Sequence, residues 1–332
     1  MNAAIWIWAM ACQDPDKASQ NVNLDQELGV LDMTLDLADP PEGGYQFASP
    51  EIVVDPYSEV NLCYYGTYEG PTVGVNFMTP FAPDGITHHA SLMAIYDDEY
   101  EDGELIDCLA QGENNMPIYS PLFEAVGLDT VGGEPFETDP FGGLNWIDVP
   151  EGVAFKLETG QRWALDLHYI NTTEQTALVN TGFNVGTVPE EEVEHWASTL
   201  QFDAGLIDLE PGSSWESFQC PWEDDFTVLS IMGHMHDFGS YYGVDWNKLD
   251  GTDELVYSVD EWTADHKDYP KITYYEPGDI VVQQGEEFTT HCEWFNPTDE
   301  VLPNPAEMCT TVIVAYPMEK PLTCIRGEYI DY

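Results

Sequence analysis

The chain has 332 residues, and its 62 acidic side chains outnumber 8 basic ones, which gives a formal net charge of −54 and a pI near 4.1. A field of this sign repels polyphosphates, so the composition argues against nucleic-acid binding and against a basic patch for anionic membranes. The chain is still 43% hydrophobic and 13% aromatic, which is typical of a folded core. Its length suits one large domain or two ordinary ones, and no apolar run is long enough for a transmembrane helix.

The N-terminus is expected to direct export. Residues 3–11 are apolar and lead into Cys12, as in bacterial lipoprotein signals, although no basic residue precedes them. We expect an export or lipoprotein signal over residues 1–12, with lipid attachment at Cys12 as one outcome, and a polar, turn-rich tether over residues 13–25. The alternative is a soluble protein with a stray apolar stretch.

Six further cysteines lie at wide spacing without a CxxC pair, which favours disulfides in an oxidising compartment over a zinc site. They are Cys63, Cys108, Cys220, Cys292, Cys309 and Cys324. Six cysteines allow 15 pairings, so the spacing alone does not choose among them. We expect the protein to be periplasmic, a cell-surface lipoprotein, or secreted.

After the tether, the chain reads as many short strands separated by Gly, Pro, Asn and Asp. The clearest strands are predicted over residues 59–65, 90–96, 163–170, 177–185, 226–232, 279–283 and 310–316. One helix is predicted over residues 189–200, because a proline starts it and three glutamates fill its first turn. The stretch 110–143 gives no clear strand signal.

These patterns predict an all-β protein of two antiparallel β-sandwich (jelly-roll-like) domains in tandem. We place the boundary near residue 200, so that the N-terminal sandwich spans residues 26–199 and the C-terminal sandwich residues 200–332.

Histidines on the predicted strands indicate a metal site. Side chains alternate along a strand, so Asp166 and His168 lie opposite the apolar face of residues 163–169. In the same way, His234 and His236 share a face with Met232. Each histidine alone is more often a surface or hydrogen-bonded residue, but together with the adjacent pair His88 and His89 they favour metal binding.

Other polar residues are given ordinary roles. His195, His266 and His291 match no motif and are expected to be surface or structural residues. Carboxylates at Asp225, Asp237 and residues 97–99 could bind Ca²⁺, but in so acidic a chain such groups are more often solvated. Met308 shares its strand face with Thr310 and Val312, where a methionine is most often core filler.

The order of several short motifs resembles the copper type II, ascorbate-dependent monooxygenases, the family of peptidylglycine α-hydroxylating monooxygenase and dopamine β-monooxygenase. The segments that carry this resemblance are 87–93 after Cys63, 150–155, 167–171, 202–205, 234–239 after Cys220, 292–296, 307–309 and 322–324. They span about residues 55–325 in the family's order.

The resemblance implies two copper ions per chain. It implies an all-nitrogen site made by His88, His89 and His168, and a second site made by His234, His236 and Met308, which would be the catalytic one. Imidazole suits copper, and a thioether selects Cu(I). The resemblance also implies disulfides between Cys63 and Cys108, Cys220 and Cys324, and Cys292 and Cys309.

The sequence departs from the family where the amidating enzyme binds a peptide carboxylate. Met232, Thr310 and Val312 stand at those positions, so peptide amidation is disfavoured and an apolar substrate wall is expected. Asp166 is a candidate partner for a substrate ammonium, or a carboxylate that orients His168.

The function expected from the resemblance is a copper-dependent monooxygenase that hydroxylates a C–H bond of a small organic substrate with O₂ and a reductant such as ascorbate. A non-catalytic copper-binding or copper-delivery protein is the first alternative. A structural β-sandwich lipoprotein with chance histidines is the second.

Overall fold

The computed structural model describes residues 29–95, 100–108, 119–126, 149–222, 224–268, 270–303 and 306–330. Residues 119–126 and a few single positions, among them His89, are described by their backbone only. The expected signal and tether, with Cys12, lie outside the described residues.

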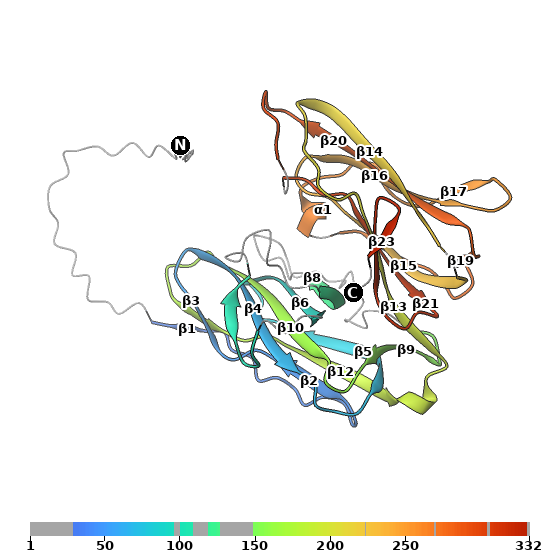
Figure 1. The fold of residues 1–332 in the computed structure, drawn as a ribbon. Coiled ribbons are helices and arrows are strands. Elements are labelled where there is room, and N and C mark those ends of the chain that lie inside the picture. Colours follow the sequence, from blue (N-terminus) through green and yellow to red (C-terminus); the bar gives the residue numbers. More distant parts are fainter. Residues whose placement is uncertain are drawn as a thin grey trace, which may run out of the picture.

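The N-terminal lobe is a β-sandwich (Figure 1). One of its sheets has the order β7-β4-β10-β6-β8, and β9, β5, β12 and β2 form the facing layer. A small sheet, β1-β11-β3, lies at its edge. The strands are β1 Leu31–Asp32, β2 Tyr45–Ala48, β3 Ile52–Val54, β4 Ser58–Thr67, β5 Val73–Phe81, β6 Thr87–Ile95, β7 Leu105–Asp107, β8 Tyr119–Val126, β9 Val153–Leu157, β10 Arg162–Asn171, β11 Ala177–Val179 and β12 Gly182–Pro189.

The C-terminal lobe is a second sandwich. The sheet β14-β20-β16-β17 faces a layer built around β15, β21 and β13. Its elements are β13 His195–Asp203, β14 Gly212–Pro221, β15 Phe226–His234, β16 Gly239–Asn247, β17 Asp253–Val259, α1 Asp265–Asp268, β18 Ile272–Tyr274, β19 Val281–Val282, β20 Glu287–Asn296, β21 Thr310–Tyr316, β22 Leu322–Ile325 and β23 Glu328–Ile330. The predicted all-β fold of two antiparallel sandwiches in tandem is therefore confirmed.

One sheet continues from lobe to lobe. Strand β13 pairs in parallel with β9 of the N-terminal lobe and antiparallel with β21 of its own lobe. Leu229 and Val314 accordingly pack into the N-terminal core. The lobes are joined by backbone hydrogen bonds and by shared apolar contacts, and β13 crosses residue 200, the expected boundary.

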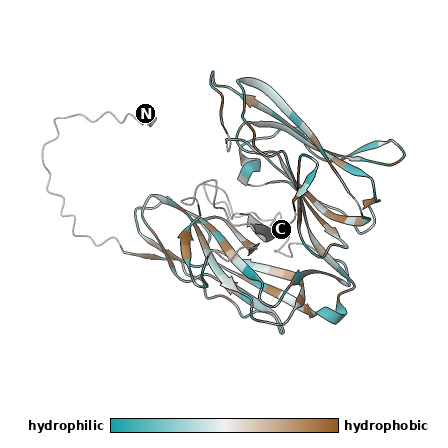
Figure 2. Cartoon of the chain, viewed as in Figure 1, coloured by the Kyte–Doolittle hydropathy of each residue, from teal (hydrophilic) through white to brown (hydrophobic). Residues whose placement is uncertain are grey.

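Alternating burial explains why these segments form strands. In β10, Leu165, Leu167 and Tyr169 are fully buried, while Asp166 and His168 between them are only partly buried. Hydrophobic and hydrophilic residues alternate along the strands of both lobes (Figure 2). The apolar faces of each pair of sheets meet to form the two cores.

Two expectations about local structure are wrong. The expected helix over residues 189–200 is a single 3₁₀ turn, Glu190–Glu192, followed by β13. Proline and the glutamates do start a turn, but pairing of β13 with strands of both lobes outweighs the local preference. In addition, β8 lies inside the stretch 110–143, to which the sequence assigned no strand.

The three disulfides join Cys63 to Cys108, Cys220 to Cys324, and Cys292 to Cys309. The last two link β14 or β20 to the facing layer of the C-terminal sandwich. Such bonds persist in oxidising compartments, so they fit an exported protein. Among the described residues, the helical segments are too short and polar to span a bilayer.

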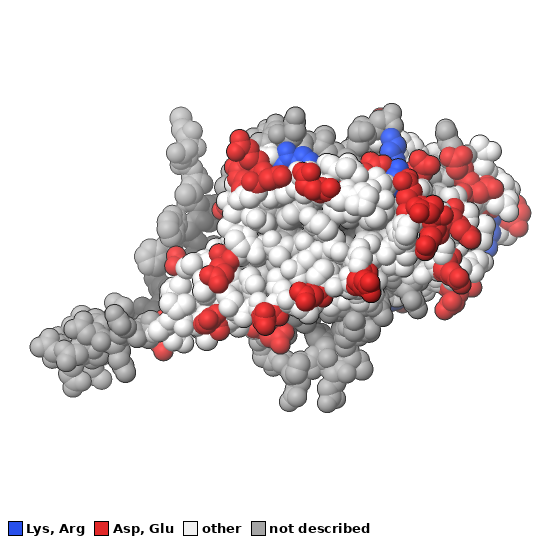
Figure 3. Space-filling model, turned by 90° about the horizontal axis from the view of Figure 1, so that it is seen from below, with Lys and Arg blue, Asp and Glu red and all other residues white. Residues whose placement is uncertain are grey.

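Charge is distributed unevenly over the surface. Seen from below, the molecule presents a broad uncharged centre with carboxylates around it and few basic side chains (Figure 3). The dominance of negative charge, which is evident from the composition, thus extends over the folded surface.

Candidate metal sites

The first candidate site lies on the outer face of the N-terminal lobe's five-stranded sheet, where His88 of β6 meets His168 of β10. Their Nδ1 atoms are 3.2 Å apart, and their ring centroids are 4.7 Å apart at an interplanar angle of 66°. Two imidazoles therefore converge through the same kind of nitrogen.

A β-bulge brings this about. In the β10–β6 ladder, His168 pairs with His89 but Tyr169 pairs with Thr87, which leaves His88 as an extra residue on β6. A bulge interrupts the alternation of side chains and re-aims the residue that it inserts. The backbone of His89, the other expected ligand, thus lies directly opposite His168, while its side chain is outside the described residues.

Glu59 of β4 fixes the orientation of His168. Its Oε1 lies 2.8 Å from His168 Nε2. A neutral imidazole that donates its Nε2–H to a carboxylate has its lone pair on Nδ1, the atom that faces His88. In that tautomer, Nδ1 of His168 can accept a hydrogen bond or ligate a metal ion.

The spacing of the two nitrogens fits a shared ion. Imidazole nitrogens bind Zn²⁺ at about 2.0–2.1 Å, so two of them around one tetrahedral ion are separated by about 3.3–3.4 Å. The observed 3.2 Å is close to this value. The ordinary alternative is a hydrogen bond between the rings, in which one Nδ1 carries the proton.

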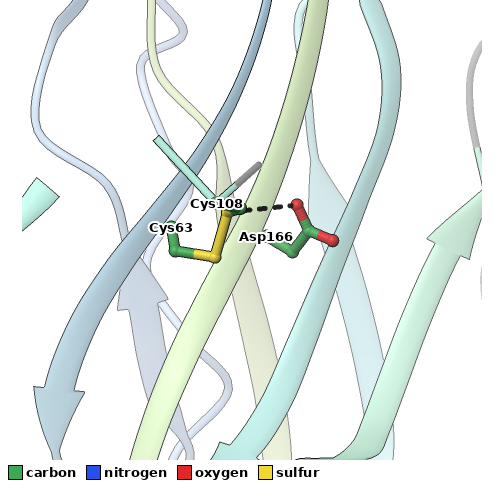
Figure 4. A group of neighbouring side chains, drawn as sticks. All are labelled: Cys63, Cys108 and Asp166. Atoms are coloured by element: carbon green, nitrogen blue, oxygen red, sulfur yellow. Dashed lines mark hydrogen bonds between the residues drawn. A yellow bond between two sulfur atoms is a disulfide. The ribbon is translucent and has the colours of Figure 1, made fainter. Parts of the chain in front are cut away.

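Asp166 faces the Cys63–Cys108 disulfide. Its Oδ1 lies 3.8 Å from Cys108 Sγ (Figure 4). Cys63, Cys108 and Asp166 form a compact group of potential ligands, but both sulfurs are used in the disulfide and offer no thiolate. Glu59 is hydrogen-bonded to His168, a role for which the sequence had suggested Asp166 as one of its two possibilities.

The second candidate site lies at the end of β15. The rings of His234 and His236 have centroids 5.2 Å apart at 84°. Burial lowers the pKa of His234 to about 4, and the charges of His236 and Lys267 act in the same direction. His234 is therefore neutral at pH 7, as a metal ligand must be.

Glu307 is the structural centre of this region. It is fully buried, and its carboxylate accepts hydrogen bonds from the backbone nitrogens of His236, Phe238 and Met308 and from Nε1 of Trp294. Burial raises the pKa of Glu307, against the effect of these hydrogen bonds. One carboxylate thus fastens the histidine segment to the methionine segment.

The backbone register places Met308 near His236. In the β15–β21 ladder, His234 pairs with Thr310, and continuing this register by two residues sets Met308 opposite His236. Glu307 Oε2 supports the same placement, because it accepts from the backbone nitrogens of both His236 and Met308, at 2.8 and 3.2 Å. The three expected ligands of the second site therefore lie on neighbouring chain segments.

The expected substrate residues of this lobe differ in their surroundings. Met232 and Val312 are partners in the β15–β21 ladder and are both half-buried. Thr310 is buried and donates a hydrogen bond to Asp203 Oδ2 at 2.6 Å. The β15–β21 ladder has a bulge just after Val228, and Val228 belongs to the core.

The other histidines, and the carboxylates Asp225 and Asp237, have local partners. His291 pairs with Asp245 at 3.0 Å, and His266 accepts a hydrogen bond from the Thr263 backbone. Asp225 accepts from the backbone of Gln284, and Asp237 pairs with Lys267. His195 lies beside Tyr316, and residues 97–99 are outside the described part.

Comparison of the sequence with known protein families and with curated proteins finds no match. Among solved structures, the chain resembles PNGase F, a glycosylasparaginase from Flavobacterium meningosepticum, at 9% identity and a TM-score of 0.32, over 85% of this chain and 100% of that one. It also resembles a peptide-N(4)-(N-acetyl-β-D-glucosaminyl) asparagine amidase at 9% identity and a TM-score of 0.31, over 78% and 96% of the two chains. A structure of infectious bursal disease virus, Gt strain, matches at 11% identity and a TM-score of 0.20, over 84% and 73%.

These comparisons correct the family expectation. No family match supports the copper type II monooxygenases, and the first two structures above are named as a glycosylasparaginase and an asparagine amidase. The expected family, the C–H hydroxylating activity and the classification as a copper oxidoreductase are therefore withdrawn. The physical reason is that the motifs are short, and histidine pairs on strands with nearby cysteines do not define one activity. The likenesses themselves transfer no activity to this chain.

Two residues of the candidate sites were not singled out from the sequence. Glu59 shares a strand face with Asn61 and Cys63, a weak signal that such a carboxylate points toward the histidine sheet face. Glu307 directly precedes Met308, but its burial and its role in joining two segments follow only from the tertiary structure.

Proposed function

We propose that this protein binds transition-metal ions at two histidine sites, and that copper is the metal its ligands favour. The observation that carries the proposal is the 3.2 Å approach of His88 Nδ1 and His168 Nδ1, with Glu59 on the far nitrogen of His168. Carboxylate–histidine pairs of this kind orient metal ligands in many proteins. We keep His89, whose backbone pairs with His168, as the third ligand of this proposal.

The second site is proposed at His234, His236 and Met308. It is supported by the neutral state of His234 and by Glu307, which holds the other two residues together. Imidazole alone suits zinc, copper or nickel, whereas a thioether favours Cu(I), so the donor set as a whole favours copper. A bound copper ion would supply redox or Lewis-acid chemistry. The residues themselves bind and orient it.

We further propose that the protein works outside the cytoplasm, as a periplasmic, cell-surface or secreted protein. Three disulfides support this location. A lipid anchor at Cys12, the only membrane attachment that we propose, would place it at a membrane surface. The substrate, O₂ and reductant expected as partners depended on the withdrawn activity and are not carried further.

Metal stoichiometry tests the proposal. Protein freed of metal by a chelator and reloaded with Cu(I) should bind two ions. His168→Ala should remove one ion and Met308→Leu should weaken the other by about tenfold or more. His291→Ala is the matched control, because His291 has the same imidazole–carboxylate pairing on the outer face of the other lobe. Unchanged copper content in His168→Ala would refute the first site.

A further inference from the structure

The outer face of the C-terminal lobe's four-stranded sheet carries exposed aromatic side chains. Trp215 of β14 is 73% exposed and Phe295 of β20 is 55% exposed. Tryptophan and phenylalanine are usually buried, so two exposed aromatic residues on one sheet are unusual. In Figure 1 this sheet lies on the side of the molecule away from the N-terminal lobe.

The ladder places an aromatic residue on each side of a carboxylate. Glu293 of β20 pairs with Trp215 of β14 on one side and with Tyr241 of β16 on the other. Directly paired residues have Cβ atoms about 4.5–5.5 Å apart on the same face. Phe295, two residues after Glu293, lies diagonally next to Trp215. We call Trp215, Glu293, Tyr241 and Phe295 the aromatic–carboxylate patch.

A glycine makes room for the tyrosine ring. A Cβ at Gly243 would lie 2.5 Å from the Tyr241 hydroxyl and 3.0 Å from its Cζ, so the ring lies along the sheet over Gly243. The Tyr241 ring therefore occupies the space over Gly243, on the strand next to Glu293.

The charge around the patch is negative. Glu293 is exposed at its centre, and Asp245 beside it pairs with His291. Burial, followed by the charges of Asp245, Asp260 and Glu293, raises the pKa of Tyr241. The whole chain adds a net charge of −54, which draws cations toward such a surface.

We propose that the aromatic–carboxylate patch docks an arginine-bearing segment of a partner protein. A guanidinium stacks on an aromatic face and offers two parallel N–H groups to a carboxylate, and the patch presents both features side by side. An anionic ligand is disfavoured by the carboxylates. A lysine side chain would keep the charge but lose the planar stacking and the paired hydrogen bonds. This inference does not depend on the metal sites.

Peptide titration tests the proposal on the full chain. The probe is a short capped peptide with two arginines separated by a glycine, and matched peptides carry lysine or the uncharged isostere citrulline. The arginine peptide should bind most tightly, the lysine peptide more weakly, and the citrulline peptide least. Trp215→Ala and Glu293→Gln should each weaken arginine-peptide binding by about tenfold, and Trp215→Phe should retain most of it.

Two control variants separate the patch from the general charge of the molecule. Tyr57→Ala removes a 72% exposed aromatic residue from the N-terminal lobe, and Glu51→Gln removes an exposed carboxylate there. Both should bind the arginine peptide as the unmodified chain does. Three outcomes would overturn the proposal. They are equal binding by all variants, binding of the citrulline peptide as tight as that of the arginine peptide, and no binding of the arginine peptide at low salt. Trp215-dependent binding of an uncharged oligosaccharide without any arginine preference would also overturn it.

Discussion

At the scale of single residues, two carboxylates organise the candidate sites in different ways. Glu59 is two-thirds exposed and acts on one atom, His168 Nε2. Glu307 is fully buried and gathers four N–H groups from three chain segments. Glu59 acts on the tautomer and orientation of one proposed ligand, His168. Glu307 fixes the positions of the backbone segments around the second site. Their substitution should therefore affect different measurements.

For Glu59, the expected effect is on metal affinity. Glu59→Gln removes the charged acceptor of His168 Nε2–H and should weaken copper binding at the first site by about tenfold, because such carboxylates raise ligand basicity and hold the tautomer. Competition with a chromophoric chelator measures this. The melting temperature should stay within error, and Glu51→Gln should leave the affinity unchanged. A large loss of stability without a loss of affinity would contradict the role given to Glu59.

For Glu307, the expected effect is on stability. Glu307→Ala leaves buried N–H groups of His236, Phe238, Met308 and Trp294 without their acceptor, and each unsatisfied group costs about 1–3 kcal/mol. Unfolding in denaturant should show a loss of about 3 kcal/mol or more in metal-free protein. Glu300→Ala, at an exposed position of the same lobe, should change little. An unaltered unfolding midpoint in Glu307→Ala would rule out this role.

At the scale of elements, Tyr242 of β16 packs closely against β15 and supports the strand that carries His234. A Cβ at Gly233 would lie 2.3 Å from Cε1 of Tyr242, whose hydroxyl donates to the Thr310 carbonyl oxygen at 2.7 Å. Tyr242 thus lies under the residue before His234 and is fixed to the strand that pairs with it. A side chain at position 233 must displace the Tyr242 ring or push β16 of the facing sheet away from β15.

Gly233→Ala should accordingly destabilise the protein by about 1–3 kcal/mol, the usual cost of overpacking a core, and weaken metal binding at the second site. Calorimetric unfolding together with Cu(I) titration measures both effects. Gly29→Ala is the control, because a Cβ there would meet only the end of Gln175 at 3.8 Å. Wild-type stability in Gly233→Ala would mean that Tyr242 can move aside without cost.

The positions of several strands could be predicted from the sequence, but their bulges and partners could not. The sequence located β10, β15 and β21 almost to the residue. Alternation marks β10, whereas β15 and β21, which are buried on both faces, are marked by their content of Val, Ile, Thr and aromatic residues. These signals could not locate the bulges at His88 and after Val228, since a bulge is set by the neighbouring strand. The helix expected over residues 189–200 failed because β13 gains partners in both lobes, which are distant in sequence.

The candidate sites were predictable only in part for the same reason. Histidines could be placed on a strand face, and in this way His168 and the pair His234 and His236 were found. Which carboxylate would reach His168 depended on the order of strands in the sheet. Glu59 lies 109 positions away in the chain and meets His168 only because β4 pairs with β10.

At the scale of the whole molecule, charge opposes folding. With a net charge of −54, repulsion between carboxylates destabilises the compact native state. Salt screens this repulsion. The melting temperature at pH 7 should rise as NaCl increases from about 0.01 to 1 M, over which the screening length falls from about 30 to 3 Å. Near the pI of about 4.1 the rise should be much smaller. A melting temperature that falls with salt at pH 7 would contradict this reading.

The central claim is that His88 and His168 hold one metal ion between their Nδ1 atoms. A crystal structure of the copper-loaded protein, with anomalous data on both sides of the copper absorption edge, tests it most directly. We expect an anomalous peak within ligand distance of both Nδ1 atoms, with Glu59 still bound to His168 Nε2. A structure in which copper binds elsewhere, while the two rings remain hydrogen-bonded to each other, would contradict it.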